Sequence, residues 1–178
     1  FYEKIYFVRP KNPKKALVIT WILPPQIQFS DCKPLNHVMG IFDNPGSGGI
    51  ASVLKERNLT LDFQMNQEQE GFGYNHEFCL ARLLIELTEN GAENIEMILE
   101  LIFSYLLMIQ QTPIEEHQRL FEQDSKTIET AFKFHVERSA LSNVRVSKDF
   151  LFYKDADVLR TSLTPTFNAE AITNVINS

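Results

Sequence analysis

The sequence predicts an α+β domain, with an antiparallel sheet of about four or five strands and helices layered chiefly on one face. The first observation is a change of period between Leu80 and Gln110, where strand-like alternation gives way to helical spacing. The second is the strand character of Lys15–Leu23 and Thr60–Gln67. Helical segments separate and follow these strands, which favours an α+β fold.

Four segments have strand patterns. Glu3–Val8 is a short candidate, and Lys15–Leu23 is so continuously apolar that we expect cover on much of both faces. Thr60–Gln67 alternates apolar and polar residues, which indicates an edge or surface strand with one polar face. A glycine-containing turn over 68–75 predicts a hairpin between Thr60–Gln67 and the strand that includes Leu80–Leu87.

The central helix is predicted between Ile95 and Ile109, and its start by a capping box of Asn90 and Glu93. It is apolar on most of its circumference, so we expect it to be buried between layers. Two shorter helices precede it, one over Pro34–Asp43 and one starting at Ile50.

Thr112, Pro113 and Glu115 predict the start of the next helix, with Thr112 as N-cap, the proline at the first helical position and Glu115 as the capping-box glutamate. Because only two residues separate it from the central helix, we expect it on the surface and antiparallel to that helix. Further helices are predicted over 138–152, 155–160 and Asn168–Ile176, the last capped by Asn168.

Composition limits the function classes. The chain has 178 residues, 44% of them hydrophobic and 22% charged, and a net charge of −6, which argues against a nucleic-acid partner. No segment is typical of a secretory signal or a membrane span, and two cysteines provide no disulfide framework. We expect a cytoplasmic, intracellular protein. Because the first residue is Phe1, we interpret the chain as a fragment of a longer protein.

No catalytic or metal-binding pattern emerges from the residues. The four histidines are scattered singly, and Glu116-His117 resembles half of an H-x-x-E-H zinc motif that has Pro113 in place of its first histidine. Gly46–Gly49 precedes a helix but lacks the lysine of a phosphate loop, so a tight turn is the better interpretation. Cys79 is a candidate core residue, and nothing marks a base for Cys32.

Peptide binding is better supported by the pattern. An edge strand over Leu61–Gln67 would expose amides and carbonyls to which an extended peptide could add. The simpler alternative, an edge strand that only faces water, stays open.

A set of collinear segments resembles the second, non-catalytic domain of the insulin-degrading enzyme (insulysin) family. These segments are KALVITWILPP, GSGGIASVLKERNL, IELTENGAENIEMILELIFSYL, the Pro-Ile-Glu-Glu helix, AFKFHVERSALSN and DADVLR, and they extend from about Tyr6 to Arg160. The resemblance implies a zinc metalloendopeptidase of four similar α+β units that enclose a chamber, with the zinc in a unit outside this chain.

The resemblance also implies which residues act. In the catalytic unit the zinc motif lies on the helix matching Pro34–Asp43, but after His37 this chain has Gly40 and Ile41 where the second half of the motif would stand. The family anchors peptides partly by strand addition to an edge strand. The matching substrate-binding residues are Phe63, Met65, Asn66, Gln67, Gly46 and Gly48. Met65 and Asn66 replace two glycines of the family pattern, which alters close approach but not backbone pairing.

Residues 1–178 are therefore expected to form one non-catalytic domain, lacking the final strand of the family's unit. Its predicted role is to anchor peptide substrates and to form part of the chamber wall of an insulysin-like peptidase. A purely structural scaffold is the alternative. The expected partners are peptide substrate and the parent's other domains, without nucleic acid, membrane or a cofactor in this chain, since zinc is expected only in the parent's catalytic domain. Self-association through the open sheet edge is a further expectation.

Overall fold

The computed structural model describes residues 5–8, 11, 14–67, 73–134, 144, 146–147, 149–151, 153, 158, 163 and 166–178. Three strands form an antiparallel sheet: β1 (Ala16–Leu23), β2 (Thr60–Gln67) and β3 (Cys79–Leu87). Their order is β1-β3-β2, so β3 is central and pairs with both neighbours. The predicted antiparallel hairpin and the position of β2 at an edge of this sheet are confirmed.

The number of strands is smaller than predicted. The part of the chain that the structure describes has three strands, not four or five. Residues 5–8, which belong to the predicted first strand Glu3–Val8, form no strand, and an isolated bridge joins Tyr74 to Cys79.

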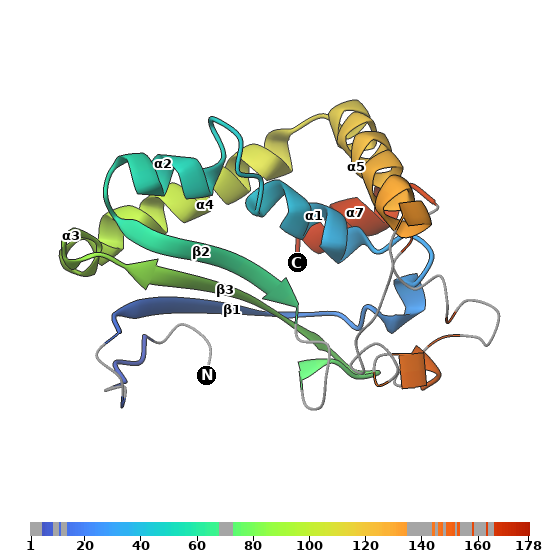
Figure 1. The fold of residues 1–178 in the computed structure, drawn as a ribbon, viewed down its shortest axis with the longest axis horizontal. Helices are drawn as coiled ribbons and strands as arrows, with labels where there is room; N and C mark the ends of the chain where they lie inside the picture. Colours follow the sequence, from blue (N-terminus) through green and yellow to red (C-terminus); the bar gives the residue numbers. More distant parts are fainter. Residues whose placement is uncertain are drawn as a thin grey trace.

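Helices cover one face of the sheet (Figure 1). A short 3-10 turn, Ile27–Phe29, leads into the first of them. They are α1 (Pro34–Phe42), α2 (Ile50–Glu56), α3 (Glu89–Glu93), α4 (Ile95–Gln111), α5 (Ile114–Phe134) and α7 (Ala169–Ile176). The predicted cap of α7 is present, because the Asn168 side chain accepts a hydrogen bond from the Ala171 amide at 3.0 Å. This helix packs against α1.

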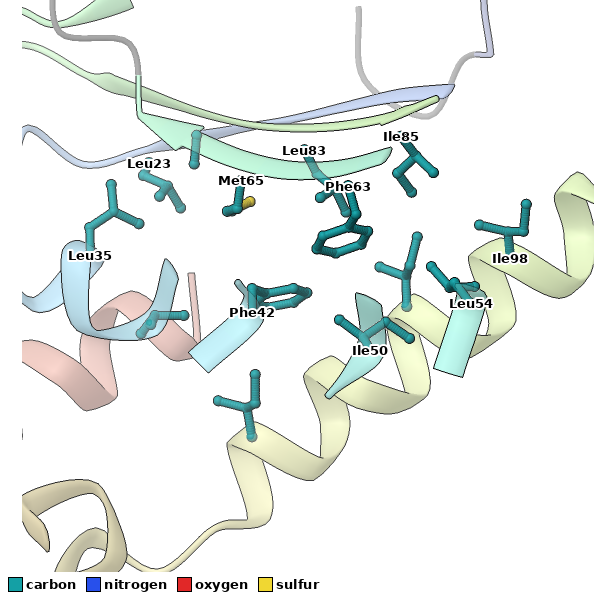
Figure 2. Packing of buried hydrophobic residues seen from close by; sticks show 14 of the residues in the cluster. Leu23, Leu35, Phe42, Ile50, Leu54, Phe63, Met65, Leu83, Ile85 and Ile98 are labelled. Carbon is teal, nitrogen blue, oxygen red and sulfur yellow. The ribbon is translucent and has the colours of Figure 1, made fainter. Parts of the chain in front are cut away.

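The core lies between the sheet and the helices. Alternate residues of β2 and β3 point toward apolar side chains of α1, α2 and α4, as Figure 2 shows. The cluster includes Leu23, Leu35, Phe42, Ile50, Leu54, Phe63, Met65, Leu83, Ile85 and Ile98. Burying one face of each element in this way is what the period-two and helical patterns require.

The central helix does not start as predicted. Thr88 Oγ1 accepts a hydrogen bond from the Gly91 amide at 2.9 Å and so caps the short α3, after which α4 begins at Ile95. Asn90, the predicted cap, instead donates from its side chain to the Asn58 carbonyl at 3.3 Å. A threonine two residues before the predicted cap was the better N-cap, because it satisfies a helix amide directly.

Two predicted burials are also wrong. In α4 only Ile98, Ile102 and Ile109 are buried, and Phe103 and Leu107 on its other side are exposed. The apolar strand β1 is covered on one face, while Val18 and Ile22 on the other are each 49% exposed. Both elements therefore present apolar side chains to solvent within the described residues.

The orientation of α5 differs from the prediction. It begins at Ile114, one residue after the predicted start at Pro113, and α4 and α5 meet at a bend of 100°, so they are not antiparallel. The Thr112 hydroxyl donates back to the Met108 carbonyl at 2.9 Å and so belongs to the end of α4. No single described helix is long and apolar enough to cross a membrane, and α4 and α5 meet those criteria only when joined across the bend.

The predicted helices over 138–152 and 155–160 lie largely outside the described residues, as does His135.

Candidate functional site

The edge strand β2 is the candidate site, and its backbone geometry follows from its pairing with β3. In an antiparallel pair, alternate residues direct their amide and carbonyl groups toward the partner strand and the others direct them away. The Met65 amide donates to Asp43 Oδ1 at 3.0 Å, so it faces away from β3. By the same alternation the amides of Phe63 and Gln67 face outward, and Phe63 donates to Asp62 Oδ1 at 3.0 Å.

The side chains of the predicted site residues on β2 divide into two sets. Phe63 and Met65 are only 8% and 7% exposed and point into the core between sheet and helices (Figure 2). Asn66 is exposed, and Gln67 is partly buried. A ligand beside β2 would therefore contact Phe63 and Met65 through their backbone, because their side chains are committed to packing.

The side chain of Gln67 donates a hydrogen bond to the buried thiol of Cys79 on β3. Burial raises the pKa of the Cys79 thiol to about 11, and a side-chain hydrogen bond from Gln67 opposes that rise. A thiol with so high a pKa is a poor nucleophile at neutral pH. Cys79 is a core residue, and Gln67 ties the end of β2 to the central strand.

The glycine turn between α1 and α2 is held by its own groups. The Gly46 amide donates to Asn44 Oδ1 at 2.9 Å, and the Gly49 amide donates to the Gly46 carbonyl at 3.0 Å. Gly48 has φ +92°, and a Cβ on Gly49 would lie 2.3 Å from the Asn44 carbonyl oxygen. These two amides are already bonded within the turn, which supports a tight turn and not a phosphate site.

The structure brings together two histidines that the sequence patterns treated as single residues. His37 on α1 and His117 on α5 are 6% and 2% exposed. His37 Nε2 lies 3.2 Å from His117 Nδ1, and His117 Nε2 lies 3.2 Å from the carbonyl oxygen of Ile109 at the end of α4. The pair therefore links three helices. Spacing could not reveal it, because 80 residues separate the two rings.

The partners assign the protons of this pair. A carbonyl oxygen only accepts, so His117 carries its proton on Nε2, and its Nδ1 accepts from the Nε2–H of His37. His37 Nδ1 is then unprotonated and buried, with no hydrogen-bond partner among the described residues. Burial, and secondarily the charge of His117, lower the pKa of His37 to about 4. This environment favours the neutral form of His37.

These histidines do not fit a zinc site. Two of the four ring nitrogens bond to each other, and Gly40 and Ile41 offer no ligand side chain on α1. Zinc in proteins takes three or four such ligands. Within the described ranges, no group of three or more His, Cys, Asp or Glu side chains is placed to hold a metal ion.

The remaining candidate reactive groups and the surface depression show no feature of a catalytic site among the described residues. Cys32 is buried, and its thiol pKa is raised by burial and by the charge of Asp31. Glu116 pairs with Arg119 on the exposed face of α5, at 2.6 Å and 2.8 Å. A shallow depression of 340 Å³ at the junction of α4 and α5 is lined by Ser104, Leu107, Met108, Gln111, Thr112 and Pro113, none of which titrates near neutral pH.

Comparisons with known proteins agree on one group of related proteins. The chain is 28% identical to nardilysin of Rattus norvegicus over 178 residues, which are 99% of this chain and 15% of that protein. It is 26% identical to "Insulin-degrading enzyme-like 1, peroxisomal" of Arabidopsis thaliana over 170 residues, 94% of this chain and 17% of that protein. The chain thus spans about one sixth of the length of these relatives. No protein-family profile matches it.

The fold has a counterpart among solved structures. The crystal structure of pitrilysin matches with a TM-score of 0.83 over 94% of this chain and 18% of that one, at 15% sequence identity.

Proposed function

Because the chain belongs to the pitrilysin/insulysin family of zinc metallopeptidases, as a homologue of one segment of its longer members, we propose that it anchors peptide substrates without catalysing their cleavage. In this proposal it forms part of the chamber wall of an insulysin-like peptidase. The zinc and the hydrolytic chemistry belong to a separate catalytic unit of the parent protein.

The position of β2 at the end of the order β1-β3-β2 carries the proposal. Its outward amides and carbonyls, at Phe63, Met65 and Gln67, have the spacing that an added strand needs. Main-chain hydrogen bonds supply affinity in strand addition and tolerate many side chains, which suits a site that holds varied peptides.

The composition of α1 supports the catalytically inert part of the proposal. The helix that matches the zinc-motif position contains His37, whose Nε2 is bonded to His117, and it lacks the further ligands that zinc requires. Activation of water by zinc would need those ligands in another part of the parent.

A titration of backbone amides tests the anchoring role. The probe is a capped, uncharged octapeptide rich in threonine and valine, added to the isotopically labelled chain. We expect shifts in the amides of Leu61–Gln67 and in few others. Binding that moves amides elsewhere and leaves these unchanged would refute the proposal.

Two matched variants of Gln67, at the end of β2, make the test more specific. Gln67→Pro removes an outward backbone amide without removing a backbone hydrogen bond to β3, which edge strands tolerate. Gln67→Ala keeps the amide and loses the same side chain. We expect the proline variant to bind the octapeptide about three- to tenfold more weakly than the alanine variant, as for one lost hydrogen bond.

A scaffold role is the second candidate, and the outer face of the sheet favours it. Val18 and Ile22 on β1 and Leu84 on β3 form exposed apolar surface on the face away from the helices. Apolar side chains gathered in this way are typical of a docking surface. If the chain only packs against other units, Val18→Glu in the parent protein should impair assembly while the Gln67 variants leave peptide affinity unchanged.

A further inference from the structure

The outward amide in the middle of β2 already has a partner. Asp43 follows the last residue of α1, and its own amide donates to the Met39 carbonyl at 2.9 Å, which fixes its backbone at the end of that helix. From there its carboxylate reaches across 22 residues of sequence to accept the Met65 N–H at 3.0 Å. Asp43 thus joins the α1 end to the edge strand.

The carboxylate occupies the position that a bound strand would need. In strand addition, a carbonyl of the incoming peptide accepts the outward N–H of Met65 at the same distance and along the same direction. Two oxygens cannot both occupy that position. Peptide pairing at Met65 and the Asp43 hydrogen bond are therefore mutually exclusive.

A second carboxylate acts on the neighbouring outward amide. Asp62 Oδ1 accepts the Phe63 N–H at 3.0 Å, and its other oxygen accepts from the Gln64 side chain at 2.7 Å. Two successive outward amides of β2 are thus held by acidic side chains of the chain itself. Charged groups at an edge are a known means of preventing unwanted strand pairing.

We propose that Asp43 sets the affinity of β2 for extended peptides by occupying the Met65 amide until a peptide carbonyl displaces it. The inference rests on the proposed anchoring function. Asp43 is an exposed residue, so its carboxylate can turn into water when it is displaced. In the free chain the Met65 amide is bonded to the Asp43 carboxylate, and a peptide binds when its carbonyl replaces that carboxylate as the acceptor.

The test compares three variants by titration with the same octapeptide, following the amides of Phe63, Met65 and Gln67. Asp43→Ala removes the acceptor, and Asp43→Asn keeps an oxygen of similar position without the charge. Asn44→Ala is the matched control, because Asn44 bonds the Gly46 amide in the same loop and leaves the Met65 amide held by Asp43.

We expect Asp43→Ala to bind at least about tenfold more tightly than the unmodified chain, since hydrogen bonds to charged groups are the strong ones. Asp43→Asn should gain less, and Asn44→Ala should bind like the unmodified chain. In the free Asp43→Ala chain, the Met65 amide should also exchange faster with solvent.

Three results would overturn the inference. Equal affinity in the unmodified chain and in Asp43→Ala, both at β2, would refute the role of Asp43 while leaving the anchoring function intact. A gain of equal size in Asn44→Ala would assign the effect to loop mobility. If no variant binds the octapeptide at β2, both the inference and the proposed function fail.

Discussion

Acidification should destabilise this chain through the buried pair of His37 and His117. The pKa of His37 is lowered to about 4 in the folded chain, against an ordinary value of 6.5. The unfolded chain therefore binds a proton more readily than the folded one does. Stability is fully present above the unfolded value, falls as the pH drops below about 6.5, and stops falling near the folded value of about 4.

The size of the effect follows from those two values. Each tenfold difference in proton affinity corresponds to about 1.4 kcal/mol, which limits the total loss to roughly 3 kcal/mol. Roughly 2 kcal/mol of it should appear between about pH 7 and about pH 5. The structural cause is that a proton on His37 Nδ1 would find no acceptor among the described residues.

Urea unfolding at both pH values measures this loss, and a variant isolates it from other titrating groups. In His37→Gln the side-chain amide can still donate to His117 Nδ1 but does not titrate. We expect its free energy of unfolding to fall by roughly 2 kcal/mol less than that of the unmodified chain over the same pH change. His76→Gln, at an exposed histidine, is the control and should behave like the unmodified chain. An equal fall in the unmodified chain and in His37→Gln would refute the reasoning.

Three further predictions concern stability and are measured by the same unfolding experiment at neutral pH. Thr88→Ala should cost about 1 kcal/mol, because it removes the cap of α3; a loss below about 0.3 kcal/mol would contradict that assignment. Gly91→Ala should cost about 1–3 kcal/mol or more, since a Cβ would lie 1.9 Å from the Leu59 carbonyl oxygen; unchanged stability would exclude that close approach. Ile102→Ala should cost about 2–5 kcal/mol and Phe103→Ala less than about 1, because only Ile102 is buried; similar losses would contradict the orientation of α4.

Local sequence patterns predicted the helices and strands better than they predicted the burial and tertiary contacts of those elements. The alternation predicted β2 and the burial of Phe63 and Met65, and Asn168 predicted the cap of α7. These features depend on residues within one or two turns of the chain. Leu61, the third apolar residue of that alternation, is 62% exposed, beside a register shift between Thr60 and Asp62.

The cap before α3 and α4 was assigned to the wrong residue because Thr88 and Asn90 are both good caps, and only contacts with Asn58 select Thr88 for α3. The separate start of α4 after Asn94 has no side-chain cap to reveal it.

Contacts between distant segments could not be predicted from one sequence. The pairing of His37 with His117 depends on the 100° bend between α4 and α5, which no local pattern specifies. The bond from Met65 to Asp43 is of the same kind, because an aspartate after a helix is an ordinary residue until the fold places it beside a strand edge. The prediction that β1 and α4 are buried on both sides was wrong, because an apolar sequence does not specify which other segment packs against each face.

The burial of Phe63 and Met65 limits the registers in which a peptide could pair with β2. The strand cannot slip by one residue along β3 without turning both side chains into water, so its register is fixed. The outward amides therefore stand at a constant repeat of roughly 7 Å, two residues apart. An extended peptide that pairs with these amides could therefore bind only in registers two residues apart, whatever side chains it carries.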